Sequence, residues 1–176
     1  MASVSIEAIN NQFMGGHRNV VFVGPPGVGK TSIIHRLIGS SFSDTRSTTA
    51  LCVYRFEGDA IDSNGQIVKT FIWDTPGDDR YSWQADRVSS RADLIVFVEG
   101  SESESRPAFD RDYGDTRVIK VWNKCDLRDV RLRGGDIIET SALTMENIST
   151  LRDIVSATSF DDIETIRDQG HSNHCC

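Results

Sequence analysis

The chain has 176 residues, of which 38% are hydrophobic, and carries a formal net charge of −7 from 19 basic and 26 acidic residues. This size allows one buried core, and the acidic balance argues against a nucleic-acid-binding surface. No apolar stretch could span a bilayer and residues 1–16 lack the apolar centre of a signal peptide, so we expect a cytosolic protein with reduced cysteines.

The first predicted strand is the apolar run from Val20 to Val23, followed by a glycine-rich turn and a helix from Ser32 to Leu37. The turn has the P-loop pattern, in which Gly27 and Gly29 let backbone N–H groups converge on phosphate at a helix N-terminus. The predicted phosphate-binding residues are Gly24, Gly27, Val28, Gly29, Lys30, Thr31 and Ser32.

Two side chains of this turn have predicted roles of their own. Lys30 is expected to bridge the β- and γ-phosphates, and the Thr31 hydroxyl to bind Mg²⁺, a cation that prefers oxygen ligands. The alternative is a glycine-rich turn with a chance Lys-Thr pair, and the motifs further along the chain weaken it.

Two more strands are predicted at Cys52 to Phe56 and Ile67 to Trp73, and the Asn-Gly pair between them favours a hairpin. A final helix begins near Asn147. Alternating strands and helices predict an α/β fold with a mostly parallel central sheet, helices on both faces, and ligand loops at the carboxyl ends of the strands. The remaining predicted strands are Leu94 to Val98, Val118 to Trp122 and Ile137 to Ile138, and the apolar stripe of the final helix is Ile148, Leu151 and Val155.

A polar tetrapeptide, Asn123-Lys124-Cys125-Asp126, follows one of these strands directly. A carboxylate there can accept two hydrogen bonds from the adjacent donors of guanine, and it would stay unpaired against adenine. We therefore expect Asp126 to select the base, Asn123 to brace the loop and the stem of Lys124 to lie over the base. Together with the P-loop, this motif predicts GTP binding.

With these motifs the chain resembles the Ras superfamily of small GTPases, most closely the Rab branch, from about Val20 to Thr158 and at its last two residues. The resemblance implies a P-loop NTPase G domain with a Mg²⁺-dependent GTPase activity and a cycle between GTP and GDP. Asp74 would hold a Mg²⁺-bound water, and the Gly77 N–H would contact the γ-phosphate. Thr49 falls where the family has its second metal-ligating threonine, with Thr48 as the competing candidate.

The resemblance also implies contacts with the guanine. Phe42 matches the aromatic residue that packs on its edge. The segment Thr140-Ser141-Ala142-Leu143 resembles the loop whose backbone N–H meets the guanine carbonyl, so Ser141, Ala142 and Leu143 are candidate contacts. We expect an N-terminal extension over residues 1–16, a G domain over residues 17–158 and an acidic tail over residues 159–176.

Cys175 and Cys176 resemble the double-cysteine prenylation site of Rab proteins. The resemblance implies prenylation machinery as a partner and lipid-mediated attachment to the cytosolic face of a membrane. Because the preceding tail is acidic, attachment would depend on lipid alone. A transition-metal clip with His171 and His174, or an unmodified end, are the alternatives.

Two positions bear on hydrolysis. Asp78 stands where the family usually carries a glutamine that positions the attacking water; it lacks the amide donor and adds negative charge, so we expect slow hydrolysis. Arg46 has the spacing to Thr49 that places a cis arginine finger in heterotrimeric G-protein α subunits, and the alternative is a solvated arginine. The predicted catalytic residues are Lys30, Thr49, Gly77, Asp78 and Arg46.

Two functions remain open from the sequence. One is a GTP-hydrolysing switch in vesicle traffic, with effectors, an exchange factor and a GTPase-activating protein as partners. The other is a GTP-loaded, nearly non-hydrolysing scaffold on a membrane. A nucleotide kinase would need an acceptor site and a basic lid, and the sequence contains neither. The segments between Gly77 and Asn123 and between Asp126 and Ser141 are shorter than usual for Rab proteins, which predicts one truncated and one missing helix.

Overall fold

A computed structural model describes residues 17–42, 47–61, 67–100, 112–127 and 137–157, without the side chains of residues 59–61. The predicted hairpin turn at residues 62–65, Arg46 and the two terminal cysteines lie outside the described residues. So do residues 101–111 and 128–136, which are parts of the two shortened segments, Gly77 to Asn123 and Asp126 to Ser141, where one truncated and one missing helix were expected.

Within the described residues, six strands form one sheet in the order β2-β3-β1-β4-β5-β6. The first strand pair, β2 and β3, is antiparallel, with Ile61 opposite Ile67, and every other pairing is parallel. The predicted mostly parallel sheet is therefore confirmed, and each predicted strand is present. The strands are β1 (His17–Val23), β2 (Cys52–Ile61), β3 (Ile67–Asp74), β4 (Leu94–Gly100), β5 (Arg117–Asn123) and β6 (Ile137–Glu139).

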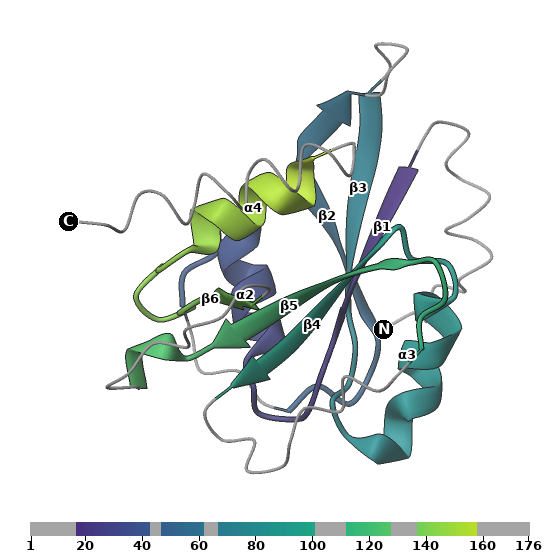
Figure 1. The fold of residues 1–176 in the computed structure, drawn as a ribbon, viewed down its shortest axis with the longest axis horizontal. Coiled ribbons are helices and arrows are strands. Elements are labelled where there is room, and N and C mark those ends of the chain that lie inside the picture. Colours follow the sequence, from purple (N-terminus) through teal and green to yellow (C-terminus); the bar gives the residue numbers. More distant parts are fainter. Residues whose placement is uncertain (1–16, 43–46, 62–66, 101–111, 128–136, 158–176) are drawn as a thin grey trace.

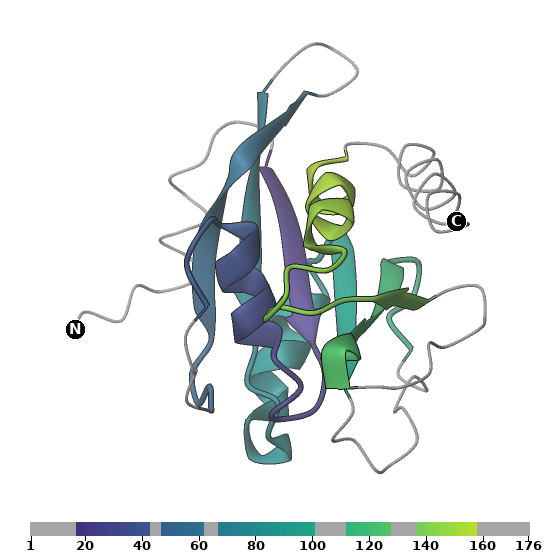
Figure 2. The same ribbon diagram turned by 90° about the vertical axis from the view of Figure 1, so that its left-hand side faces the viewer.

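Helices cover both faces of this sheet, as predicted: α2 and α4 lie on one face and α3 on the other (Figures 1 and 2). The P-loop helix begins at Lys30 rather than at Ser32, and the final helix begins directly after Asn147, as expected. The sequence analysis assigned no residues to the third helix, α3, which lies in one of the two shortened segments, between Gly77 and Asn123. The α-helices of the described residues are α2 (Lys30–Leu37), α3 (Ser82–Ser89) and α4 (Ile148–Ser156), and the short 3₁₀ helices are η1 (Asp79–Tyr81) and η2 (Cys125–Leu127).

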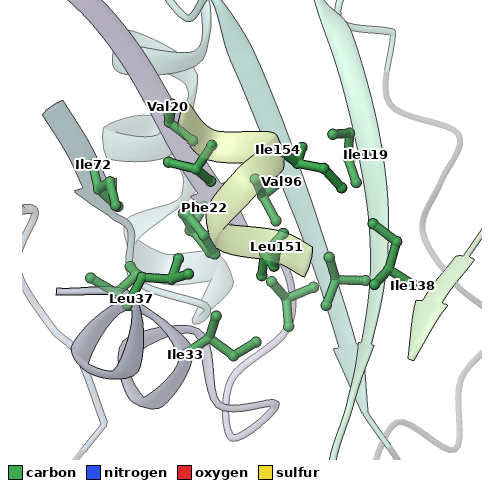
Figure 3. Close-up of a cluster of buried hydrophobic side chains, with 14 of the residues drawn as sticks. Val20, Phe22, Ile33, Leu37, Ile72, Val96, Ile119, Ile138, Leu151 and Ile154 are labelled. Carbon is green, nitrogen blue, oxygen red and sulfur yellow. The ribbon is translucent and has the colours of Figure 1, made fainter. Parts of the chain in front are cut away.

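The larger core lies between the sheet and the pair α2 and α4. Helix α2 buries one face through Ile33, Ile34 and Leu37, which recur at helical spacing. From α4, Leu151 and Ile154 enter the same cluster, where strand residues of β1, β4 and β5 meet them (Figure 3). The predicted stripe of α4 is buried in full. A smaller core under α3 contains Val21, Val23, Trp73, Ala85, Val88, Ile95 and Phe97.

Two arginines fasten α4 to the rest of the fold. The guanidinium of Arg18 in β1 donates to the carbonyls of Val155 and Ala157, which lie at the carboxyl end of α4. From α4, Arg152 donates to Leu37 O at 2.5 Å and lies over the ring of Phe56, 5.0 Å from its centre. These bonds satisfy carbonyls that helix ends leave without partners. The last described helix is thereby held against both β1 and α2.

The predicted functional motifs lie at the carboxyl ends of the strands, along one side of the sheet. The P-loop follows the carboxyl end of β1, Asp74 ends β3, Asn123 ends β5, and Thr140 follows β6. Parallel strands of an open α/β sheet bring such ends together, so residues far apart in sequence meet there. None of the described helices is long and apolar enough to cross a membrane.

Candidate functional site

A cavity of about 460 Å³ opens at the carboxyl ends of the strands. Small-molecule sites typically enclose about 300 to 1,000 Å³. The sequence-predicted residues that line it are Gly27, Gly29, Lys30, Thr31, Ser32, Phe42, Thr49, Gly77, Asp78, Asn123, Lys124, Asp126, Ala142 and Leu143. The sequence prediction did not include its further lining residues Pro26, Ser47, Arg80, Tyr81 and Leu127, and it held Thr48 only as an alternative.

The glycines of the cavity wall allow close packing of three loops. Gly29 has φ 94° and forms the N-cap of α2, and a side chain there would collide with the amide of Asn123. A Cβ on Gly77 would lie 2.6 Å from the Nζ of Lys30. Only glycine fits both places without displacing a neighbour. The P-loop is thus in direct contact with the end of β5 and with the loop after β3.

Lys30 is a nearly buried cation, 6% exposed. Its Nζ donates to Gly24 O at 2.7 Å and to Pro25 O at 2.8 Å. Gly24 does not line the cavity but acts through this carbonyl. Burial lowers the pKa of Lys30 to about 8, although the charge of Asp74 opposes that shift. A phosphate in the cavity would supply the missing counter-charge.

Three side-chain oxygens gather beside Lys30. Thr31 Oγ1 donates to Asp74 Oδ2 at 2.7 Å and lies 2.9 Å from Thr48 Oγ1. Asp74 is 1% exposed, and its other oxygen, Oδ1, has no hydrogen-bond partner among the described residues. Burial raises the pKa of Asp74, and the Thr31 hydrogen bond opposes this. A buried carboxylate oxygen without a partner, next to two hydroxyls, fits a cation such as Mg²⁺.

The protein oxygens alone would not enclose that cation. No group of three or more His, Cys, Asp or Glu side chains that could hold a metal occurs in the part of the chain that is described. Mg²⁺ commonly takes one or two protein ligands and completes its shell with water and substrate phosphates. Both competing threonines line the cavity, and the hydroxyl of Thr48 also lies against that of Thr31. The assignment of Thr49 as the ligand stays a prediction.

Asn123 joins the loops on the base-selecting side. Its side chain is 2% exposed, and its Nδ2 donates to Val28 O at 2.9 Å. Its Oδ1 accepts from the backbone N–H of Ala142 at 3.2 Å. One amide therefore connects the P-loop with the loop after β6. Val28, predicted to bind phosphate, lies outside the cavity lining: its carbonyl is bound to Asn123 and its side chain is buried in the larger core.

The Asp126 carboxylate is oriented by Ser141, which the sequence analysis expected to contact the guanine instead. Its Oδ1 accepts from Ser141 Oγ at 2.5 Å, while the backbone N–H of Ser141 donates to Glu146 O. Ser141 is outside the cavity lining, and it is connected to the site through the bond from its hydroxyl to Asp126. Lys124 has φ 63°, a conformation that is uncommon for residues other than glycine and is often found at functional sites.

Phe42 is 38% exposed and lines the cavity. The guanidinium carbon of Arg36 lies 5.7 Å from the centre of its ring, and Arg36 Nε donates to Ala142 O at 2.8 Å. Arg36 therefore connects the predicted aromatic contact with the predicted base loop. The sequence prediction missed Arg36, because only its place in the last turn of α2 brings it to these two partners.

Asp78 and Arg80 form an ion pair at the cavity. Arg80 Nη2 lies 2.6 Å from Asp78 Oδ2, and Arg80 Nε lies 2.9 Å from Asp78 Oδ1. The backbone N–H of Arg80 also donates to Asp78 Oδ1, which caps η1. Hydrogen bonds from Arg80 lower the pKa of Asp78 to about 2, so this carboxylate is ionised at neutral pH. The predicted negative charge is present, but it is paired with a cation that the sequence prediction overlooked.

Comparison with known proteins places these motifs in a family. The family model described as "Ras of Complex, Roc, domain of DAPkinase" matches residues 19–126. The "Ras-related protein RABA5b" of Arabidopsis thaliana is 30% identical over 165 residues, which cover 82% of this chain and 75% of that protein. The "Ras-related protein Rab-11A" of Dictyostelium discoideum is 30% identical over 154 residues, covering 73% and 69% respectively. The "Ras-related protein YPTC6" of Chlamydomonas reinhardtii is 29% identical over 151 residues, covering 73% and 68%.

Proposed function

Because this chain belongs to the Ras superfamily, as a divergent Rab-like GTPase that binds GTP and GDP with Mg²⁺, we propose that it is a membrane-attached switch in vesicle traffic with slow intrinsic hydrolysis. In the GTP state it binds effectors, and an exchange factor and a GTPase-activating protein drive the cycle. The observation that carries the proposal is the bond from Asn123 to Val28 O, which couples the base-selecting loop to the P-loop around one cavity.

Binding of the triphosphate is assigned to the P-loop side of the cavity. The N-terminus of α2 offers backbone N–H groups to phosphate, and Lys30 exchanges its two carbonyl partners for phosphate oxygens. Mg²⁺, held with the help of Thr31, Asp74 and Thr49, would neutralise phosphate charge. The close approach of Gly77 to Lys30 supports a contact from the Gly77 N–H to the γ-phosphate.

Base selection is assigned to the other loops. The carboxylate of Asp126 accepts from both donors on the guanine edge, and Ser141 fixes its orientation. Phe42, Ala142 and Leu143 supply apolar and backbone contacts, since all three line the cavity. Loss of the γ-phosphate after hydrolysis removes the contacts that order the loops near Thr49 and Gly77, and effectors are released.

Slow hydrolysis is proposed from the chemistry of Asp78. A carboxylate accepts but does not donate hydrogen bonds when it is ionised, and its pKa of about 2 keeps it ionised at neutral pH. It therefore cannot position a water through an amide donor. The same low pKa favours the second candidate function, a GTP-loaded scaffold, because a carboxylate with a pKa of about 2 is a weak general base. Arg46 remains a proposed cis arginine finger and lies outside the described residues.

Membrane attachment is proposed through prenyl groups on Cys175 and Cys176, by resemblance to Rab proteins. Two lipid chains give stable attachment, whereas one is marginal. The protein would then reside in the cytoplasm and on the cytosolic face of a membrane, with prenylation machinery as a partner. The G domain is proposed to span residues 17–158, with the extension at residues 1–16 and the tail at residues 159–176 lying outside it.

A direct test is to purify the full chain, identify the bound nucleotide by chromatography and follow GTP turnover with and without Mg²⁺. A cycling switch releases GDP and phosphate slowly and requires Mg²⁺. A scaffold retains intact GTP over the same period. Preference for adenine nucleotides, or binding of no nucleotide, would contradict both functions.

A further inference from the structure

We propose that Arg80 is a γ-phosphate-binding residue that Asp78 holds in reserve until GTP arrives, an inference that rests on the proposed binding of GTP in the cavity. In the absence of γ-phosphate, Asp78 is the counterion of the guanidinium. When GTP is bound, the guanidinium turns from Asp78 to the γ-phosphate oxygens.

The placement of the pair supports this exchange. Asp78 and Arg80 both line the cavity, and Asp78 directly follows Gly77, whose backbone is packed against Lys30. Lys30 is the side chain assigned to the β- and γ-phosphates, so the pair belongs to the phosphate side of the cavity. The side chain of Arg80 is 77% exposed, which leaves its guanidinium free to change rotamer.

The energetics favour the exchange. An exposed ion pair contributes little to stability, so releasing Arg80 from Asp78 is easy. Asp78 keeps a partner after the release, because the backbone N–H of Arg80 still donates to its Oδ1. A guanidinium can bind phosphate through two parallel hydrogen bonds, and the γ-phosphate carries more charge than one carboxylate. The γ-phosphate is therefore the stronger partner.

The exchange also explains how an acidic residue is tolerated at this position. The Asp78 carboxylate and a γ-phosphate would repel each other if nothing lay between them. A guanidinium bound to the γ-phosphate reduces the negative charge that Asp78 faces and so weakens that repulsion. GDP has no γ-phosphate, so Arg80 stays on Asp78 in the GDP state. Arg80 thus makes the cavity discriminate between GTP and GDP.

The experiment compares the affinities of the full chain for GDP and for a non-hydrolysable GTP analogue, both with Mg²⁺. Arg80→Ala should lose about 10- to 100-fold in affinity for the analogue and retain its affinity for GDP, because only the contact between a guanidinium and the γ-phosphate is removed. Arg80→Lys should recover part of the loss. Arg87→Ala, which removes an exposed arginine of α3 outside the cavity lining, is the matched control and should behave as the wild type.

A second pair of variants tests the role of Asp78. Asp78→Asn removes the charge and should restore part of the analogue affinity in the Arg80→Ala background, since the unbalanced repulsion is gone. Equal losses for GDP and the analogue in Arg80→Ala would identify a structural role and overturn the inference, as would no loss at all. If the wild type binds neither nucleotide, the proposed function itself fails, and that outcome is distinct from both.

Discussion

The side-chain amide of Asn123 donates to the backbone carbonyl of Val28 at 2.9 Å, across 95 positions of the chain. The same amide accepts from the N–H of Ala142, so a single buried residue connects the P-loop, the end of β5 and the loop after β6. The two halves of the cavity are therefore mechanically coupled, and a change on the base side should affect the phosphate side.

Asn123→Ala tests this coupling. The variant leaves Val28 O and the Ala142 N–H unpaired in a buried place, so it should lose about 2 to 4 kcal/mol of unfolding free energy and at least about tenfold in affinity for both GDP and GTP. Chemical denaturation and nucleotide titration measure the two effects. Asn19→Ala is the control, because it removes a comparable bond to Trp73 Nε1 in β3. It should cost stability without changing nucleotide affinity; equal affinity losses in both variants would contradict the coupling.

The protonation of Lys30 should make the affinity for nucleotide depend on pH. Burial lowers its pKa to about 8 in the free protein, and a bound phosphate should raise that pKa. Well below pH 8 the side chain is charged in both states, and nucleotide affinity is insensitive to its proton. Above pH 8 the free protein loses the proton and must take it up again on binding, so nucleotide affinity should fall as pH rises. Calorimetry at pH 8.5 in two buffers of different ionisation enthalpy should detect proton uptake, which Lys30→Met should abolish.

Restoring a glutamine at position 78 should accelerate hydrolysis. Asp78→Gln supplies an amide donor that can orient water, and a positioned group of this kind contributes on the order of 10²-fold. Asp78→Glu is the matched control, because it has the same length as glutamine but keeps the carboxylate. Single-turnover assays should show a faster step for the glutamine variant only. Equal rates in the wild type and Asp78→Gln would show that Asp78 does not limit hydrolysis.

The same single-turnover assay tests the proposed role of Arg46 as a cis arginine finger. If Arg46 supplies charge stabilisation in cis, Arg46→Ala should slow the hydrolytic step by about 10³-fold or more while GDP affinity stays the same. Arg91→Ala, an exposed arginine after α3, serves as the control for removal of one positive charge. An unchanged rate in Arg46→Ala would end the cis-arginine hypothesis and leave Arg80 as the one arginine proposed to contact the γ-phosphate.

Most of the fold could be predicted because its strands are short apolar runs such as Val20 to Val23, which are buried on both sides of a parallel sheet. Helix α3 could not be placed, because it has eight residues and only two of its three buried residues, Ala85 and Val88, are apolar, which is too few to form a clear stripe in the sequence. The start of α2 at Lys30 was missed for a local reason: the preceding glycine adopts a left-handed conformation and serves as the N-cap.

Residues of the candidate site that belong to a sequence motif were predicted. Residues whose role depends on a tertiary contact were missed. Asp126 belongs to a motif, but its bond to the Ser141 hydroxyl depends on how β5 and β6 bring two loops together. Thr48 and Thr49 are adjacent and chemically identical, so only the backbone path decides which hydroxyl meets Thr31. Arg80 was overlooked because its importance comes from its pairing with Asp78 at the cavity wall.

The central claim, that this cavity selects a guanine nucleotide through the Asp126 carboxylate, is tested most directly by Asp126→Asn. The variant replaces an acceptor with a donor opposite the guanine amino group, whereas xanthine presents a carbonyl there. GTP affinity should fall by at least about 10²-fold and xanthosine triphosphate should become the preferred ligand, with Asp153→Asn on α4 as an unaffected control. A variant that still prefers GTP to xanthosine triphosphate would contradict the claim.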